Sequence, residues 1–283
     1  MKKIIKKMFT VLIITALIIG IAIGIYILTG LDNSLTLREY NFKTDKVTNP
    51  IKIAFVSDHH GSEFGENNSE LMDMINASDP DVVLLGGDMF DEPEFVDIEK
   101  DLISQLTEKY DVYGVLGNHA YKMDEYTADD LRKIYAELGV TLLTEDCKVL
   151  MLNGEKINIC GMDVYPENEG FDGRIDKALA DTDKDAYTVM LYHRPDKWEE
   201  FKGKGIDLML SGHTHGGQWI VPGIFNGILA PNQGFFPKYA GGLYEFEDGM
   251  NLIVSRGLAT KNTIVPRVYN PPELVVIKIE SDR

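Results

Sequence analysis

The chain has 283 residues, of which 44% are hydrophobic and 26% are charged, and its formal net charge is −17. This composition is ordinary for a globular protein, and the length suits one large domain. The excess of acidic residues argues against binding to DNA or RNA and predicts repulsion from anionic membrane surfaces, because like charges repel.

The N-terminal segment differs in composition from the rest of the chain. Four lysines precede an uncharged stretch of 24 residues, Met8 to Leu31, and about 20 apolar residues are enough for a membrane-spanning helix. Lysine-rich flanks stay in the cytoplasm, so we expect a single-pass protein of the cell membrane with the remainder outside the cytoplasm. A cleaved signal peptide is the alternative, with a weak cleavage candidate at 28–34, but the apolar run is longer than a signal core.

After a polar linker at 32–50, apolar runs that predict buried strands alternate with segments of helical periodicity. Thr127 is expected to cap the last of these helices, and Gly139 to end it. The expected strands are 51–58, 81–88 and 110–118, and the expected helices are 67–77, 95–106 and 127–138.

The second half of the chain is richer in strands. Three neighbouring ranges, 140–144, 147–152 and 156–162, predict strands joined by hairpins. Strand and helix alternate early and antiparallel strands follow, which predicts an α/β domain. Further strands are expected at 186–193, 206–213, 251–257 and 272–280.

The chain has two cysteines, Cys147 and Cys160. A disulfide is permitted if the domain lies outside the cytoplasm. Two cysteines do not make a disulfide framework, however, and a free cysteine packs well in a core. We therefore expect two small buried residues that are not linked.

Polar residues of the metal-binding type follow five of the expected strands. Sites in layered α/β folds form at the carboxyl ends of strands, so we expect these five loops to meet in one place. All six histidines of the chain belong to this set. Any single one could be a core histidine, but the whole set indicates a site. The set is Asp58, His59, His60, Asp88, Asn118, His119, His193, His213 and His215.

The spacing within the set indicates how metal ions could be shared. Residues i and i+2 of an extended segment point to the same side, so Asp58 and His60 could reach one ion together if the turn stays extended. His213 and His215 could share an ion in the same way, or a turn could direct them to two ions. The two oxygens of Asp88 could bridge two cations. Mixed nitrogen and oxygen donors fit Mn, Fe, Zn, Co or Ni, and fit neither a structural zinc nor a calcium loop.

The motifs D-x-H, G-D-x-x-D, G-N-H, H and G-H-x-H occur in this order and resemble those of the calcineurin-like metallophosphoesterase superfamily. The segments "SGHTHGGQ" and "SRGL…PRVYNPPEL" are similar to its bacterial membrane-associated branch, which includes phosphodiesterase-like proteins and UDP-2,3-diacylglucosamine hydrolases. The resemblance implies an α/β fold, a metallophosphoesterase-type layered β-sandwich flanked by helices. The expected parts are a cytoplasmic basic stub with a transmembrane anchor at 1–31, a linker at 32–50 and a catalytic domain at 51–283.

The same resemblance implies a dinuclear-metal-dependent phosphoesterase that hydrolyses a phosphodiester or pyrophosphate bond by attack of a metal-bridging hydroxide. Manganese is the expected metal, with iron, zinc or cobalt as alternatives. His119 would protonate the leaving oxygen, and Asp91 would orient His119 by a hydrogen bond. The first metal would be held by Asp58, His60, Asp88 and His215, and the second by Asp88, Asn118, His193 and His213.

The chain departs from the family pattern at two positions. Ala120 stands where many members have a carboxylate, and this removes a group that could tune His119. His59 replaces a commonly apolar residue and is either a phosphate contact or an outward-facing side chain. Arg194 is the better candidate for contacting phosphate or substrate, since arginine pairs bidentately with it, and a solvated surface arginine is the alternative.

The substrate is expected to be a small-molecule phosphoester or a lipid-linked, envelope-derived compound, because an anchor raises the local concentration of such targets. The apolar stretch 219–239 either borders the site and holds an acyl chain or packs as a core loop. A non-enzymatic, membrane-anchored metal-binding sensor or scaffold is the alternative function, and Ala120 is its only support. The sequence leaves the oligomeric state open.

Overall fold

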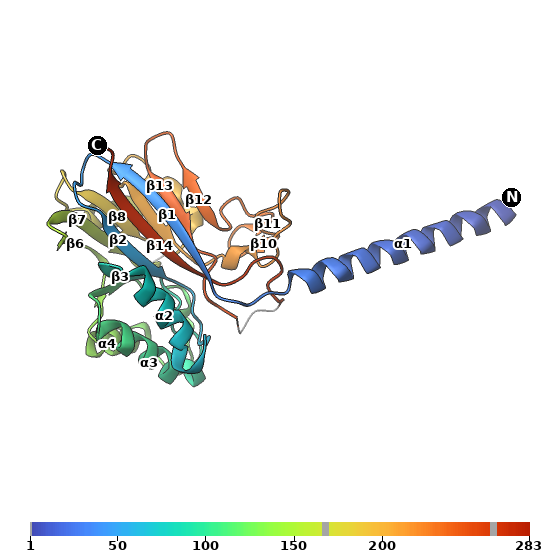
Figure 1. The fold of residues 1–283 in the computed structure, drawn as a ribbon, viewed down its shortest axis with the longest axis horizontal. Helices are drawn as coiled ribbons and strands as arrows, with labels where there is room; N and C mark the ends of the chain where they lie inside the picture. Colours follow the sequence, from blue (N-terminus) through green and yellow to red (C-terminus); the bar gives the residue numbers. More distant parts are fainter. Residues whose placement is uncertain (1, 166–169, 261–264) are drawn as a thin grey trace.

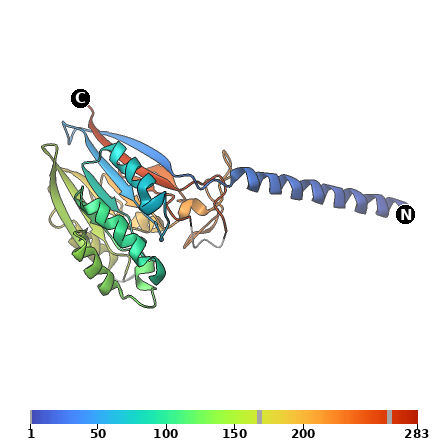
Figure 2. The same cartoon turned by 60° about the horizontal axis from the view of Figure 1, so that its bottom comes forward.

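A computed structural model describes residues 2–165, 170–260 and 265–283 of the chain. A long helix, α1 (Lys2–Gly30), projects from a layered body of two sheets and the helices that cover them (Figure 1). A view turned by 60° also shows α1 clear of the body, so the helix meets the body only at its C-terminal end (Figure 2).

Each sheet has six strands. The first has the order β1 (Thr36–Thr44), β14 (Glu273–Ser281), β2 (Ile51–Val56), β3 (Val82–Leu85), β4 (Val112–Gly114) and β5 (Thr141–Leu142). The second has the order β12 (Gly242–Glu245), β13 (Asn251–Val254), β9 (Leu208–Ser211), β8 (Tyr187–Leu191), β7 (Glu155–Met162) and β6 (Glu145–Leu152). Strands β2 to β5 are parallel, as are β13, β9, β8 and β7, so most carboxyl ends within each sheet lie on one side.

The main apolar core lies between the two sheets. Every side chain of β3 is buried, because Val82 and Leu84 pack toward the second sheet while Val83 and Leu85 pack toward the helices. A strand that is covered on both faces has no polar face, which explains the unbroken apolar run in its sequence.

Helices cover the outer face of each sheet and complete four layers. Thr127 caps α4 in a capping box with Asp130, as the sequence predicts for this position. The first sheet is covered by α2 (Ser69–Ser78), α3 (Val96–Thr107) and α4 (Ala128–Glu137), and the second by α5 (Phe171–Ala178) and the 3-10 helix η4 (Pro195–Phe201). Shorter elements are η1 (Glu66–Asn68), η2 (Pro93–Phe95), η3 (His119–Tyr121), η5 (His215–Gly217) and the hairpin of β10 (Leu229–Ala230) with β11 (Gly234–Phe235).

The predicted α/β sandwich is confirmed, but three local expectations need correction. The range 32–50 is more than a linker, because it contains β1, which pairs with β14 along its length. Five of the nine β1 residues are exposed, and this edge position explains the polar sequence. The range 140–144 joins β4 as the parallel strand β5 and does not form a hairpin with β6. The short helix α5, with its mixed composition, was not predicted.

Cys147 and Cys160 form a disulfide, so the expectation of two unlinked cysteines is wrong. The two residues are register partners in the antiparallel pair of β6 and β7, which places their side chains on the same face. Their pairing depends on the register of this hairpin, which the sequence does not specify. The disulfide lies in the core between the second sheet and its covering helices.

Among the described residues, α1 is the one helix that is long and apolar enough to cross a membrane, by length and composition. Its most apolar window is 0% buried against the rest of the protein. Only the last turns of α1 contact the body, where Gly30 is buried against Tyr269.

Candidate metal centre

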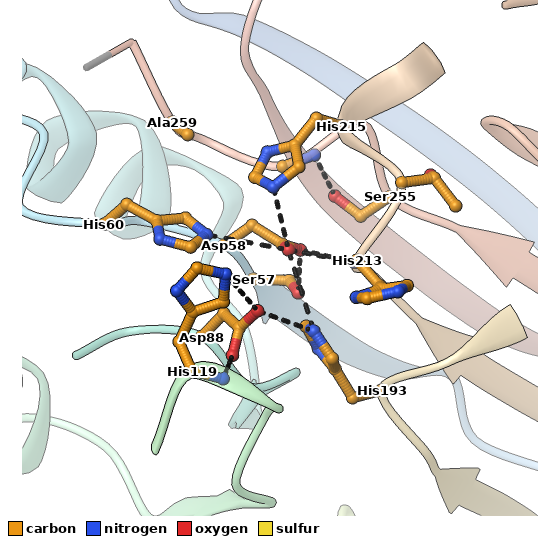
Figure 3. A network of polar contacts seen from close by, with 12 residues as sticks. Ser57, Asp58, His60, Asp88, His119, His193, His213, His215, Ser255 and Ala259 are labelled. Atoms are coloured by element: carbon orange, nitrogen blue, oxygen red, sulfur yellow. Dashed lines mark hydrogen bonds and ion pairs between the residues drawn. The ribbon is translucent and has the colours of Figure 1, made fainter. Parts of the chain in front are cut away.

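The side chains that follow the central strands converge where the two sheets meet, at the carboxyl ends of these strands (Figure 3). The site is therefore built from both sheets. Loops of the first sheet contribute Asp58, His60, Asp88, Asp91, Asn118 and His119, and loops of the second contribute His193, His213 and His215.

Asp58 lies at the centre of a first group of donor atoms. Its Oδ1 atom is 3.9 Å from Nε2 of His60 and 3.8 Å from Nε2 of His215. The backbone N–H of His213 donates to both carboxylate oxygens, at 2.9 and 3.1 Å, and the Ser57 hydroxyl donates to Oδ2 at 2.5 Å. Donor atoms of Asp58, His60 and His215 lie within 4.8 Å of one another, a separation that one metal ion could span.

Asp88 forms a second group with His193 and His213, whose donor atoms also lie within 4.8 Å of one another. The Oδ2 atom of Asp88 is 2.9 Å from Nε2 of His193, and Oδ1 accepts the backbone N–H of His119 at 2.8 Å. Nδ1 of His193 is 2.7 Å from the carbonyl oxygen of Gly86, which orients the ring. The two groups of donor atoms lie side by side, since Nε2 of His193 is also 3.9 Å from Oδ1 of Asp58. Each group contains three of the four residues in one of the ligand sets expected from the sequence.

Asp91 contacts two histidines. Its Oδ1 atom contacts Nδ1 of His119, and its Oδ2 atom is 2.9 Å from Nδ1 of His60. The expected hydrogen bond between Asp91 and His119 is thus present. Because Asp91 engages Nδ1, the Nε2 atom of His119 is the ring nitrogen left for a substrate in the pocket that this residue lines.

The backbone of the site adopts a left-handed conformation at several residues other than glycine, and each such residue stores roughly 1–3 kcal/mol of strain. The assumption that Asp58 and His60 share an extended segment is therefore wrong, because turns direct them to one point. A turn likewise separates His213 from His215 into different groups. The φ angles are 52° at Asp58, 48° at His60, 49° at Asp88, 74° at His213 and 47° at His215.

Two glycines allow the ligand loops to approach each other closely. A Cβ atom on Gly212 would collide with the carboxylate of Asp58. Gly87 has a φ of 96°, and a Cβ atom there would lie 2.7 Å from Nδ1 of His193. Any larger residue at either position would therefore displace a side chain of the site.

The donor atoms fit divalent metal ions. Among the described residues, the buried atoms Nε2 of His60 and Oδ1 of Asn118, both at the site, have no hydrogen-bond partner. A buried polar atom without a partner costs roughly 1–3 kcal/mol, so native proteins rarely leave one unsatisfied. Cations would satisfy such atoms, and the combination of imidazole, carboxylate and amide donors suits first-row divalent metals.

Two histidines of the site are strongly basic. Burial lowers the pKa of His60, but the nearby carboxylates of Asp58 and Asp91 outweigh this effect and raise that pKa to about 10. Burial also lowers the pKa of His193, and the charges of Asp88 and Asp58 outweigh it and raise that pKa to about 9. These carboxylates hold the rings in the cationic form near neutral pH.

The other ligand histidines are weakly basic. Burial and the charge on His193 lower the pKa of His213 to about 4, and burial lowers the pKa of His215 to about 3 despite the opposing charge of Asp58. Burial raises the pKa of Asp58 and of Asp88, but the charge on His193 outweighs this and holds both pKa values below the usual range. At neutral pH the two carboxylates are therefore ionised, and the imidazoles of His213 and His215 are neutral. The imidazoles of His60 and His193 would have to lose a proton before they could bind a metal.

The site opens into a pocket of about 260 Å³. Arg194 lines it, as expected for a residue that contacts substrate, and its guanidinium pairs with Asp196 at 2.9 Å. Lys122 and Tyr165 also line the pocket, and no motif in the sequence indicated them. Asn232 lines the pocket as well, and its Oδ1 atom is 2.7 Å from Nε2 of His213. Its motif "PNQG" gives no sign that it reaches the site.

His59 does not face this pocket, which corrects the expectation of a phosphate contact. Its side chain is 0% exposed, and Nδ1 lies 2.6 Å from Oε1 of Glu99, a residue of α3 that is also fully buried. The same Glu99 oxygen accepts the backbone N–H of Gly61 at 2.7 Å. The buried pair therefore holds the loop that carries His60 and leaves no face of His59 open to substrate.

Ala120, which stands where many family members have a carboxylate, lies in apolar surroundings. Its side chain is buried in the apolar core cluster that joins the first sheet to its helices. A carboxylate at this position would be surrounded by apolar side chains. The carboxylate of Asp91 contacts Nδ1 of the His119 ring.

Residues 51–217 match the protein-family model described as Calcineurin-like phosphoesterase. An uncharacterized metallophosphoesterase of Helicobacter pylori is 30% identical over 253 residues, which cover 86% of this chain and 63% of that protein. The phosphodiesterase YaeI of Escherichia coli is 26% identical over 81% of this chain and 82% of its own length.

Among solved structures, the NAD nucleotidase of Haemophilus influenzae aligns with a TM-score of 0.51 at 16% identity. The alignment covers 78% of this chain and 46% of the nucleotidase, and it indicates a similar fold. The chain thus spans less than two thirds of the Helicobacter relative and less than half of the nucleotidase.

Proposed function

Since this chain belongs to the calcineurin-like phosphoesterase family, we propose that it is a metal-dependent phosphoric ester hydrolase that uses two divalent cations. One observation carries the proposal. Loops from both sheets bring two groups of nitrogen and oxygen donors side by side, and every ligand residue that the family motifs imply is present in the sequence. A complete ligand set is the reason to prefer an enzyme over a metal-binding sensor or scaffold.

In this proposal, Asp88 would be a ligand of both cations, and each cation would take further ligands from both sheets. When bound, the cations would lower the pKa of a water molecule and neutralise charge on the phosphate oxygens. Manganese is the proposed metal, with iron, zinc or cobalt as alternatives. The proposed ligands of the first ion are Asp58, His60, Asp88 and His215, and those of the second are Asp88, Asn118, His193 and His213.

His119 is proposed as the general acid. Asp91 contacts Nδ1 of its ring, so this nitrogen carries the proton that Asp91 accepts, and Nε2 acts on the substrate. In its protonated form, Nε2 would donate a proton to the leaving oxygen as the ester bond breaks. Asp91 does not change its own protonation in this step, because the contact with the imidazolium favours its ionised form.

Arg194 is proposed to bind a phosphate oxygen. Its side chain lines the pocket and Asp196 holds it in place, so its guanidinium is oriented before substrate arrives. A positive group here complements the negative charge of a phosphoester inside an otherwise acidic protein.

We also propose that α1 anchors the protein in the cell membrane as a single span, with the catalytic body, which begins with β1, outside the cytoplasm. The lysines that precede the apolar stretch favour this orientation. The disulfide between Cys147 and Cys160 supports it, because disulfides persist in oxidising compartments and are rare in the cytoplasm. A phosphodiester or pyrophosphate of a lipid-linked or envelope compound is the proposed substrate.

The test uses the full chain purified in detergent and stripped of metal with a chelator. Mn, Fe, Zn, Co and Mg are restored one at a time, and hydrolysis of a chromogenic phosphodiester is followed beside the matching monoester. We expect manganese to restore cleavage of the diester. Two bound metals without cleavage of the diester, the monoester or a lipid pyrophosphate would favour the sensor or scaffold instead.

A further inference from the structure

An exposed apolar surface lies beside the metal site, on the segment that follows the last ligand histidine. We call it the hairpin surface; it includes the β10–β11 hairpin and the turn before it. Ile224 is 70% exposed, Phe235 is 73% exposed and Phe236 is 58% exposed. The rings of Phe225 and Phe236 pack together, with their centroids 4.7 Å apart. The stretch 219–239 therefore does not pack entirely in the core, because several of its large apolar side chains are exposed. The hairpin surface comprises Ile224, Phe225, Leu229, Phe235 and Phe236.

The end of α1 is fixed to the base of this same segment. The hydroxyl of Tyr26 donates to the carbonyl oxygen of Ile220, and the Tyr26 ring packs on Tyr269 with centroids 4.9 Å apart. Thr29 and the carbonyl oxygen of Gly30 also bond to Tyr269, each at 2.7 Å. Both views show the C-terminal end of α1 close to the β10–β11 region (Figures 1 and 2).

The length of α1 places these contacts at the surface of a bilayer. Its 29 residues span about 43 Å at ~1.5 Å per residue, which exceeds the ~30 Å thickness of the hydrocarbon core. The C-terminal end of the helix, with Tyr26 and Thr29, would therefore lie at the level of the lipid headgroups, where tyrosine is enriched. The segment bound to this end must lie at the same level.

The charge pattern of the segment fits a membrane surface. The chain carries a net charge of −17, and its acidic surface is expected to be repelled by anionic lipids. Between Ser211 and Glu245, however, the sequence contains one lysine, Lys238, and no arginine, aspartate or glutamate. The hairpin surface therefore combines exposed aromatic side chains with an absence of carboxylates, which is the composition that an interfacial surface requires.

The hairpin also forms one wall of the pocket. Pro231 and Asn232, in the turn between β10 and β11, line the pocket, and Asn232 contacts His213. We propose that the hairpin surface rests in the headgroup region of the bilayer in which α1 is anchored, so that the pocket mouth takes phosphoesters of amphiphilic substrates at the membrane surface. This inference rests on the anchoring and the phosphoesterase activity proposed above.

Tryptophan quenching tests the contact without using activity. Phe235→Trp is introduced into the full chain, which is reconstituted in vesicles of phosphatidylcholine brominated on the upper part of the acyl chains. Met151→Trp is the matched control, because Met151 is apolar and 61% exposed but lies on β6, at the far edge of the second sheet. The parent chain has two tryptophans of its own. Its emission is therefore subtracted from that of each variant to give the emission of the added tryptophan.

We expect brominated lipid to quench the tryptophan at position 235 and to leave the one at position 151 unquenched. The proposal would be overturned if the tryptophan at position 235 emitted as strongly in brominated vesicles as in ordinary ones, as the tryptophan at position 151 is expected to do. Flotation of the vesicles tests the anchoring by α1 separately from the contact of the hairpin surface. A chain that does not float with the vesicles would contradict the anchoring and therefore also the contact. An anchored chain that hydrolyses nothing would contradict the proposed activity while the quenching result still stands.

The consequence for substrate is tested with the double variant Phe235→Ser and Phe236→Ser, beside Met151→Ser. We expect a higher KM for a phosphodiester embedded in vesicles and an unchanged KM for a soluble chromogenic diester. Equal effects on both substrates, or none on the embedded one, would contradict delivery from the membrane surface.

Discussion

Oδ2 of Asp88 and Nε2 of His193 lie 2.9 Å apart although the two residues are 105 positions apart in the sequence and follow strands of different sheets. The contact exists only when the two sheets pack against each other. Folding of the sandwich and assembly of the site are therefore one event, and the apolar core between the sheets supports the geometry on which the proposed chemistry depends.

Replacing His119 by alanine tests its role as general acid. We expect kcat for the diester to fall roughly 10²–10⁴-fold, the usual contribution of general acid–base catalysis. The metal content should stay at the parent level, because the ring is proposed to donate a proton and not to bind a cation. Turnover at the parent rate, with metal content measured by atomic spectroscopy in the same samples, would assign the proton transfer to another group.

Replacing Gly212 by alanine tests the close approach of the ligand loops. The added methyl group would collide with the Asp58 carboxylate, and overpacking of this kind costs roughly 1–3 kcal/mol of stability. We expect lower metal occupancy and lower turnover. Gly173→Ala is the control, since nothing lies within 4 Å of the added atom in α5, and a helix gains roughly 0.5–1 kcal/mol from this change. Identical behaviour of the two variants would show that the loop tolerates a side chain.

Metal binding should release protons near neutral pH. His60 and His193 have pKa values of about 10 and about 9, so both rings are protonated at pH 7 in the metal-free protein. A cation that binds these nitrogens must displace about two protons. The apparent affinity should therefore rise with pH, and proton release should fade above the two pKa values.

Titration calorimetry of the chelated protein with Mn²⁺, in buffers of different protonation enthalpy, measures this release. The heat of binding should vary with the buffer at pH 7, and this variation should become smaller as the pH approaches 10. A heat that is the same in every buffer at pH 7 would contradict the assignment of these histidines as protonated ligands.

The disulfide should stabilise the fold without affecting the reaction. Its residues are 13 positions apart, and disulfides typically contribute about 2–4 kcal/mol by restricting the unfolded chain. A double variant, Cys147→Ser with Cys160→Ser, should unfold at a lower urea concentration and keep the parent kcat, since neither residue lines the pocket. Two titratable thiols in the unfolded, unreduced parent chain would show that the disulfide does not form.

The order of elements and the convergence of the ligand loops were predictable because both depend on local patterns. Apolar runs at 51–58 and 81–88 indicate buried strands, and polar residues at their ends indicate a site at one edge of the sheet. The family resemblance also implied a hydrogen bond between Asp91 and His119, and the structure has this contact.

Features that depend on distant partners were not predictable. Strand β1 is mostly polar and becomes a strand only because β14, at the other end of the sequence, pairs with it. His59 turns away from the site because Glu99 of α3 holds its ring. The left-handed turns at Asp58 and His60 arise from packing around the site, and periodicity does not specify them. Asn232 reaches His213 through a hairpin whose sequence carries no motif.

Anomalous X-ray diffraction at the manganese edge, from crystals of the full chain grown with Mn²⁺, tests the central claim most directly. We predict two strong peaks per chain on either side of the Asp88 carboxylate, one near His60 and His215 and the other near His193 and His213. A single peak, or peaks away from Asp88, would contradict a two-metal site built from the loops of both sheets.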